Sequence, residues 1–161
     1  MSPRWLPGPL RGGAPPATVP RVASERTSES PELAFAREVL RAFARRDLDW
    51  LLEHSTPDLE LHPVMWTDKP FRGRSGAVAF VEEYLAARTP LRVEVERVRQ
   101  AADPVALDVR LRGHLHLSDV DFDEHPTFVF WLRGGKLARY EGHADPDAIA
   151  EALSRSLPGG G

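Results

Sequence analysis

From residue 31 onward, apolar residues recur at helical spacing. Their positions, three and four residues apart, predict a helix over residues 31–46 and a short second helix over residues 48–54. Asp47 precedes the second helix and is a residue type that caps helix N-termini. A third apolar stripe predicts a helix over residues 76–88. The chain therefore opens on helices.

Alternation of apolar and polar residues replaces this spacing further along. A short alternating stretch predicts a strand over residues 58–62, ahead of the third helix. The later strands are expected at residues 91–95, 105–117, 128–132 and 136–143. Gly134-Gly135 marks a hairpin turn, and Asp145-Pro146 starts a closing helix. Because the helices are segregated from a run of strands, the order predicts an α+β domain with helices on one face of a curved sheet.

The two ends of the chain lack this order. Residues 1–30 mix Pro, Gly, Arg and Ser without helix or strand period, which predicts a disordered tail. The folded domain is expected over residues 31–157, followed by a frayed end over residues 158–161. Pro and Gly interrupt every apolar stretch near the N-terminus that a signal peptide would need, so we expect a cytoplasmic protein.

Composition narrows the chemistry. The chain contains no cysteine, which excludes disulfides, thiolate nucleophiles and Cys-ligated metals. Lys and Arg number 21 against 24 Asp and Glu, and the excess of acid grows without the tail, so a nucleic-acid partner is not expected. The apolar runs fall far below the roughly 20 residues of a membrane-spanning helix. Any acid–base catalysis would therefore depend on the six histidines and the carboxylates.

Four segments of the chain resemble landmarks of one protein family. They are Asp47-Leu48-Asp49-Trp50, Thr56-Pro57-Asp58-Leu59-Glu60-Leu61-His62-Pro63, Phe71-Arg72-Gly73-Arg74-Ser75-Gly76 and Gly134-Gly135-Lys136-Leu137. In this order and spacing they are similar to the SnoaL-like, nuclear transport factor 2-like superfamily, over about Glu32 to Leu157. The resemblance implies a cone-shaped, curved antiparallel sheet with helices packed on its concave face, often as a homodimer, with a small-molecule ligand and no cofactor. The fold hosts isomerases, cyclases, epoxide hydrolases and non-catalytic binders, so it does not decide the chemistry.

The resemblance to ketosteroid isomerases gives one candidate base. Their general base is an Asp before a Pro at the end of the first strand, and His62 before Pro63 occupies that position here. Histidine, with a pKa of about 6.5 when unperturbed, also accepts a proton at neutral pH. The isomerase tyrosine and its partner acid fall on Val39 and Thr127, so steroid isomerisation is not expected.

The sequence also resembles polyketide cyclases, but its candidate residues are offset by one position from the cyclase His and Asp. The cyclase His falls on Leu115, between two histidines, and the cyclase Asp falls on Gly142, between Glu141 and His143. One residue reverses the face of a strand, and a bulge near Gly113 would restore it. If Leu137 faces the cavity, regular alternation places Glu141 and His143 in the cavity as well.

These arguments give two groups of candidate residues. The catalytic group is His62, Glu141 and His143, and the ligand-binding group is Trp66, Tyr84, Phe128 and Phe130. A surface histidine, an outward ion pair of Glu141 with Arg139 or Arg133, and ordinary core packing explain the same residues without function. Residues 119–124 are expected to form a hydrated acidic loop, and no metal site is expected because the histidine spacing matches no metal motif.

Two functions follow. The first is an enzyme that isomerises, cyclises or hydrolyses a small apolar carbonyl compound by general acid–base catalysis, with His62 as the base. The second is a non-catalytic ligand-binding or dimerisation module of the same fold.

Overall fold

A computed structural model of the chain describes residues 29–64, 69–145 and 148–154. The chain divides into two compact units, Met1–Ser30 and Pro31–Gly161. All described helices and strands belong to the second unit. The predicted disordered tail and frayed end lie outside the described residues, apart from Glu29 and Ser30, and remain predictions.

The helices follow the apolar stripes closely. They are α2 (Pro31–Arg45), α3 (Leu48–Glu53) and α4 (Gly73–Ala79), which continues without a break through the π-helical η3 (Phe80–Leu85) and the 3-10 turn η4 (Ala86–Arg88). The side chain of Asp47 accepts a hydrogen bond of 3.1 Å from the backbone N–H of Trp50, which confirms the predicted cap. The third helix begins at Gly73, three residues earlier than its apolar stripe predicts.

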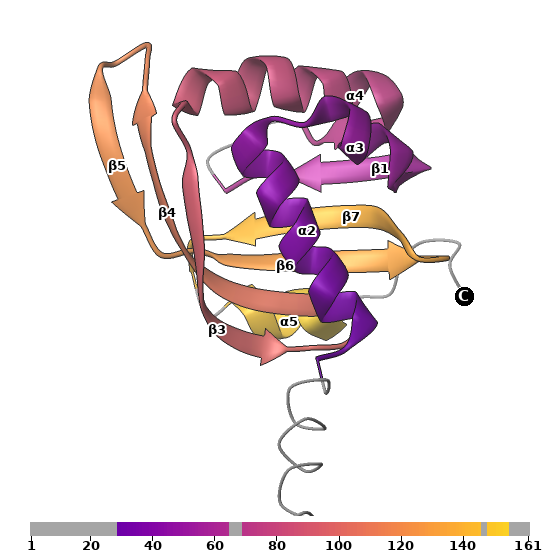
Figure 1. Cartoon of the computed structure of the whole chain (residues 1–161). Helices are drawn as coiled ribbons and strands as arrows, with labels where there is room; N and C mark the ends of the chain where they lie inside the picture. The colour runs from indigo at the N-terminus through magenta and orange to yellow at the C-terminus, as the bar shows by residue number, and fades with distance from the viewer. Residues whose placement is uncertain (1–28, 65–68, 146–147, 155–161) are drawn as a thin grey trace, which may run out of the picture. The chain divides into compact units, whose positions relative to one another are not determined.

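Within the described residues, seven strands form one mixed sheet. They are β1 (Ser55–His62), β2 (Phe71–Arg72), β3 (Arg92–Gln100), β4 (Val105–Leu115), β5 (Val120–Glu124), β6 (Thr127–Arg133) and β7 (Lys136–His143). Their order is β2-β1-β7-β6-β4-β3, and β5 pairs with β4 (Figure 1). β1 runs parallel to β7, and every other pair is antiparallel. The α+β class is confirmed, with one parallel pair that alternation along the chain does not reveal.

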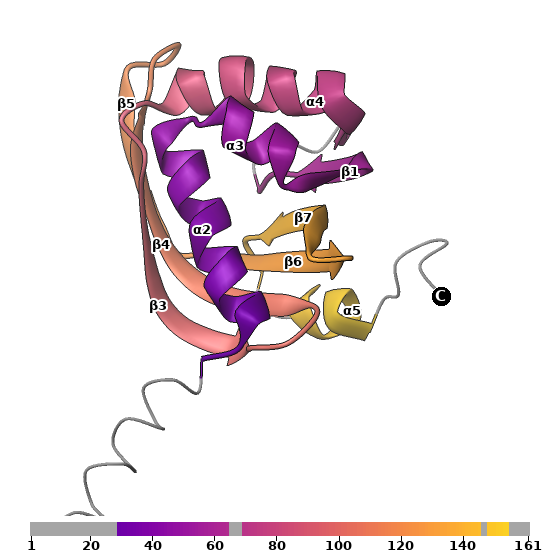
Figure 2. The same cartoon turned by 45° about the vertical axis from the view of Figure 1, so that its right-hand side comes forward.

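The sheet has two different faces. We call the face that packs against α2 and α4 the inner face, and it carries the main apolar core. Figure 2 shows β3 and β4 bending around α2 on this side. The outer face carries a second, small cluster of Ala106, Val129 and Trp131 under the closing helix α5 (Ile149–Ser154). The helices therefore cover the inner face, and most of the outer face is left to side chains of the strands.

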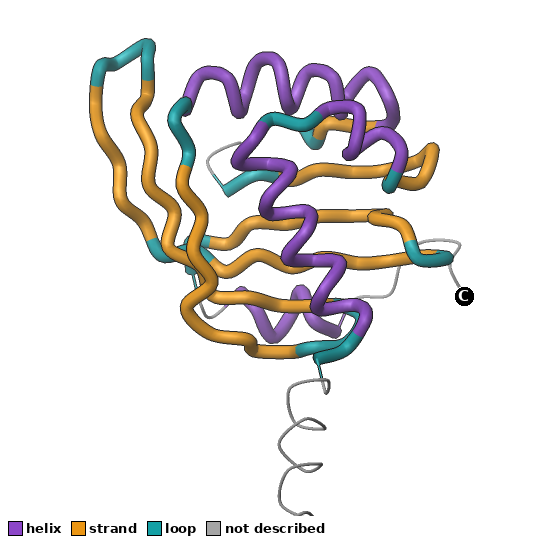
Figure 3. Tube along the Cα trace, viewed as in Figure 1, coloured by secondary structure: helices purple, strands orange, loops and turns teal. Residues whose placement is uncertain are grey.

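Residues 120–124 form a strand, which corrects the expected acidic loop. Val120 and Phe122 alternate with Asp121 and Asp123, and all of them pair in regular register with β4. The charge repulsion that favours a loop is neutralised, because Arg110 donates two hydrogen bonds to Asp123 and His114 contacts Asp121. β4 and β5 form the long hairpin at the left of Figure 3.

A bulge in β7 changes which residues share a face. The turn at Gly134-Gly135 has positive φ angles of 60° and 77°, as the predicted hairpin requires. Three residues after Gly135, Ala138 is an extra residue, because Trp131 pairs with Arg139 while Leu132 pairs with Leu137. Leu137 and Tyr140 both lie in the inner core as a result. Beyond the bulge, Glu141 and His143 lie on the outer face.

Candidate functional site

Five polar side chains of β1 and β7 meet on the outer face. Glu60 and His62 alternate along β1 with Leu59 and Leu61 of the inner core, and the register pairs Glu60 with Arg139 and His62 with Glu141. His143 continues the same face of β7 and pairs with Thr127 of β6. We call this set the outer-face cluster: Glu60, His62, Arg139, Glu141 and His143.

Arg139 joins the cluster together. Its Nε donates to Glu141 Oε2 at 2.6 Å, and its Nη1 donates to Glu60 Oε1 at 3.1 Å. Each carboxylate also holds one imidazole: Nε2 of His62 lies 3.0 Å from Glu60 Oε1, and Nε2 of His143 lies 2.8 Å from Glu141 Oε1. The result is two carboxylate–imidazole pairs bridged by one guanidinium.

These contacts determine which imidazole nitrogen is free to act as a base. An ionised carboxylate only accepts hydrogen bonds, so Nε2 of each imidazole must carry the proton that it shares. In the neutral ring, Nδ1 then carries the lone pair. Glu141 is only 3% exposed, whereas the side chains of His62 and His143 keep 30% and 17% of their surface in contact with solvent. The anion is thus shielded while both bases are accessible.

The predicted ligand-binding residues lie on the other side of the sheet. Phe128, Phe130 and Tyr84 belong to the inner core, with Tyr140 between them. The Tyr140 ring centroid lies 5.1 Å from that of Phe128 and 5.5 Å from that of Phe130. Burial, with a smaller contribution from Tyr84, raises the pKa of Tyr140 well above its usual value of 10.0. Trp66 lies outside the described residues.

The expected single site is therefore divided. The structure brings His62, Glu141 and His143 together, and it brings Tyr84, Phe128 and Phe130 together, but on opposite faces. This separation follows from the bulge at Ala138, which reverses the alternation between Leu137 and Glu141. The two groups cannot contact one small ligand across a packed sheet.

Comparison with known proteins decides the family. A family model of the SnoaL-like domain matches residues 36–140, well over half of the chain. The chain belongs to the SnoaL-like domain family. No curated protein matches it.

Solved structures show the same fold at low sequence identity. An NTF2-like protein of unknown function from Burkholderia pseudomallei is 17% identical with a TM-score of 0.61, covering 78% of this chain and 99% of that one. A candidate SnoaL-like polyketide cyclase from Jannaschia sp. CCS1 is 22% identical with a TM-score of 0.59, covering 81% and 97%. The epoxide hydrolase/cyclase-like enzyme SalBIII, from polyether salinomycin formation, is 17% identical with a TM-score of 0.61, covering 74% and 95%. The nuclear transport factor 2-like fold is thereby confirmed for this SnoaL-like domain.

Apart from His62, the positions that match the isomerase and cyclase groups carry no acid or base here. Val39 is fully buried in the inner core. The Thr127 hydroxyl donates to Asp108 at 2.6 Å on the outer face. Gly142 lies on the inner face, where an added Cβ would meet Val64 and come within 3.1 Å of the Tyr140 hydroxyl. The register of β4 with β5 is regular through Gly113, so no bulge turns His114 inward.

Glu60 is a member of the cluster that the sequence analysis did not single out, and Arg139 entered that analysis only as an ion-pair partner of an outward Glu141, a pairing that the structure shows. Each lies two residues from a predicted candidate on the same strand, a spacing that places them on one face. The missing information was the pairing of β1 with β7, which joins residues 79 positions apart.

Two absences apply to the described part of this SnoaL-like domain. Within residues 29–64, 69–145 and 148–154, no group of three or more His, Cys, Asp or Glu side chains is arranged to hold a metal ion. Over the same ranges, no helix is long and apolar enough to cross a membrane.

Proposed function

We propose that this SnoaL-like domain is an enzyme that moves protons on a small carbonyl compound, with the outer-face cluster as its acid–base machinery. The observation that carries the proposal is the pair of carboxylate–imidazole contacts bridged by Arg139. Carboxylate-oriented histidines are a recurring form of general base, because the carboxylate fixes the tautomer and stabilises the imidazolium. This arrangement needs no cofactor.

The mechanism follows from the tautomers. Nδ1 of His62 removes a proton from the carbon next to the substrate carbonyl, and the electron pair of the broken C–H bond moves onto the carbonyl oxygen as an enolate. Glu60 stabilises the His62 imidazolium that forms. His62 or His143 then returns a proton to a carbon of the enolate. Proton removal and return at different carbons isomerises the substrate, and attack of the enolate carbon on a second carbonyl cyclises it.

Arg139 fixes the positions of both carboxylates. Its guanidinium is a planar group with several N–H donors, and it donates to Glu60 and to Glu141 at the same time. Its guanidinium also lies 5.7 Å from the centre of the Trp131 ring, which limits its movement. Arg139 is thus a positioning residue in this proposal, and His62 and His143 are the catalytic ones.

The test is hydrogen–deuterium exchange at carbon. The full chain is incubated in D₂O with a panel of small aryl ketones, and loss of the proton signals next to the carbonyl is followed by NMR. His62→Ala should lower the enzymic exchange rate by about 100-fold or more, the usual contribution of a general base. His143→Ala should also lower it, because it removes the second base.

His125→Ala is the matched control. His125 is a more exposed histidine that contacts Glu96 at 2.9 Å and lies outside the cluster. The His125→Ala variant should catalyse exchange of the ketone protons at the wild-type rate. Exchange that is unchanged in His62→Ala, or absent above buffer background for the whole panel, would refute the proposal.

A second function is favoured by one observation on the inner face. The buried Tyr140 ring packs among the aromatic rings of Phe43, Phe128 and Phe130. A small aromatic ligand with an acceptor oxygen would contact these rings and accept a hydrogen bond from the Tyr140 hydroxyl, as in a non-catalytic binder. Titration with acetophenone, followed through the methyl signals of inner-face leucines, tests this. Equal affinity of wild type and Tyr140→Phe, or no shift at all, would exclude it.

We also propose that the domain forms a homodimer, as the family resemblance implies. Multi-angle light scattering of the full chain should give twice the 17.9 kDa mass of one copy. A single-copy mass that persists at high concentration would contradict this.

A further inference from the structure

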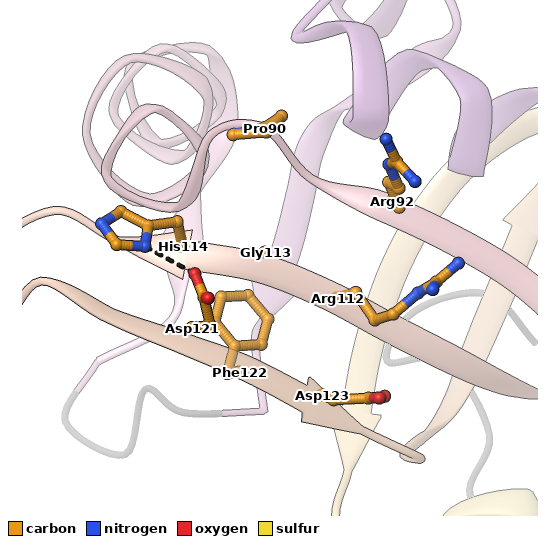
Figure 4. Close-up of a pocket in the computed structure, with 8 residues that line it drawn as sticks. All are labelled: Pro90, Arg92, Arg112, Gly113, His114, Asp121, Phe122 and Asp123. Carbon is orange, nitrogen blue, oxygen red and sulfur yellow. Dashed lines mark hydrogen bonds and ion pairs between the residues drawn. The ribbon is translucent and has the colours of Figure 1, made fainter.

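A groove of about 690 Å³ lies where β3, β4 and β5 run side by side, away from both candidate sites. Its polar lining comes from Arg92, Arg112, His114, Asp121 and Asp123. Figure 4 shows Arg112, Gly113 and His114 following one another along β4, opposite Asp121, Phe122 and Asp123 of β5. Neither the proposed mechanism nor the fold accounts for this group of charges.

The carboxylates that line the groove are already neutralised. Arg110 donates to both oxygens of Asp123, at 2.9 and 2.6 Å. His114 Nδ1 lies 2.7 Å from Asp121, and its Nε2 lies 2.9 Å from Asp119. Since carboxylates only accept hydrogen bonds, both ring nitrogens must donate, which describes the positively charged imidazolium. The acids therefore do not repel an incoming anion as free carboxylates would.

The two arginine side chains of the groove are less completely paired than its carboxylates. Arg92 and Arg112 are direct cross-strand partners, an arrangement of like charges that disfavours strand pairing. Arg112 Nη2 donates to Glu94, but its shielded Nε has no hydrogen-bond partner among the described residues. Arg92 is exposed, and its side chain has neither a hydrogen bond nor an ion pair within that same part of the chain. An oxyanion between the two guanidinium groups would relieve both deficits.

The rest of the lining is flat and apolar. Gly113 and Phe122 face each other across β4 and β5, and Pro90 adds a third apolar residue. A Cβ at Gly113 would come within 2.6 Å of the Phe122 ring and 2.8 Å of the Arg88 carbonyl oxygen, so a larger residue does not fit there. The lining of the groove thus includes the apolar residues Pro90 and Phe122 beside a pair of guanidinium groups. This combination suits an organic carboxylate with a planar ring better than a fully hydrated inorganic anion.

We propose that the groove on β3, β4 and β5 is a binding site for a small aromatic carboxylate, whose charged end contacts Arg92 and Arg112. The site lies on strands that contribute nothing to the outer-face cluster, so it stands whether or not the cluster is catalytic.

The test is a set of titrations of the ¹⁵N-labelled full chain followed by NMR at constant ionic strength. Benzoate should shift the backbone signals of Gly113 and His114 in a saturable way. Benzamide, which has the same shape without the charge, should bind at least about tenfold more weakly. Arg92→Gln should weaken benzoate binding by about tenfold as well.

Arg74→Gln is the matched control, because Arg74 is an exposed arginine of α4 that does not line the groove. It should bind benzoate with wild-type affinity, and thermal unfolding of both variants checks that each is folded. Four results would overturn the proposal. They are no saturable shift with benzoate, equal binding of benzamide, equal weakening by Arg74→Gln, and binding of inorganic phosphate as tight as that of benzoate.

Discussion

Glu141 is the residue on which the outer-face cluster depends most. It is a buried carboxylate whose two oxygens contact different partners, Oε2 the guanidinium of Arg139 and Oε1 the imidazole of His143. Burying such a charge is costly unless it is paired and hydrogen-bonded, and here each oxygen is. Glu141 thus holds the cluster in place as well as orienting His143.

Glu141→Gln should lower the free energy of unfolding by about 2 kcal/mol, because charged hydrogen bonds in a shielded site are lost. The measurement is urea denaturation at neutral pH. The control is Glu38→Gln, which removes an exposed ion pair of 2.7 Å with Arg41 and should change stability by less than about 0.5 kcal/mol. If the two substitutions lowered the free energy of unfolding equally, the buried Glu141 contacts would contribute no more to stability than an exposed ion pair.

His114 should make stability depend on pH. The hydrogen bond to Asp121, followed by that to Asp119, raises its pKa above the usual value of 6.5 in the folded state. A raised pKa means that the stabilisation is complete below about pH 6.5 and is lost as the pH rises through the folded value. The urea midpoint of the wild type should therefore fall between about pH 6 and about pH 9 by more than that of His114→Gln. Parallel pH profiles of the two proteins would contradict this.

At the scale of the element, the hairpin of β4 and β5 depends on close packing at Gly113. The Arg88 carbonyl oxygen of η4 and the Phe122 ring of β5 both occupy the space that a Cβ would need. Gly113→Ala should therefore destabilise the protein by about 1–3 kcal/mol, through displacement of β5 or η4. Thermal unfolding measures this. Leu117→Ser, at a hairpin position that is 99% exposed, should be close to neutral.

The elements also show what alternation along a sequence can predict. The span of β7 follows directly from its pattern between the Gly134-Gly135 turn and His143. The face of Glu141 does not, because the bulge at Ala138 depends on how β6 and β7 pair. β5 was missed for a related reason: its acidic residues predict a loop until Arg110 and His114 on the neighbouring strand are known.

The same limit applies to the candidate site. Regular spacing predicted that Glu141 and His143 share a face, and the structure agrees. The addition of Glu60 and Arg139 needed the pairing of β1 with β7, and the separation from Tyr84 and Phe128 needed the bulge. Contacts within one strand are thus readable from the sequence, whereas contacts between strands are not.

At the scale of the whole molecule, the unit Pro31–Gly161 contains its own core. Every residue of both apolar clusters lies between Leu33 and Leu153. Deletion of residues 1–30 should leave the thermal midpoint within about 2 °C of the full chain, since no described core contact is removed. Circular dichroism at increasing temperature measures this. A much lower midpoint would show that the first unit contributes to folding and is not a dispensable tail.

The parallel pairing of β1 with β7 determines when the outer-face cluster can form during synthesis of the chain. Glu60 leaves the ribosome long before Arg139, and until the two meet there is no bridge between the two histidine pairs. A chain that is cut short, or that stalls before its last strand docks, has all the residues of β1 and none of the arrangement. Newly made copies would therefore stay chemically silent at this cluster until the domain is finished, so activity itself would report that folding is complete.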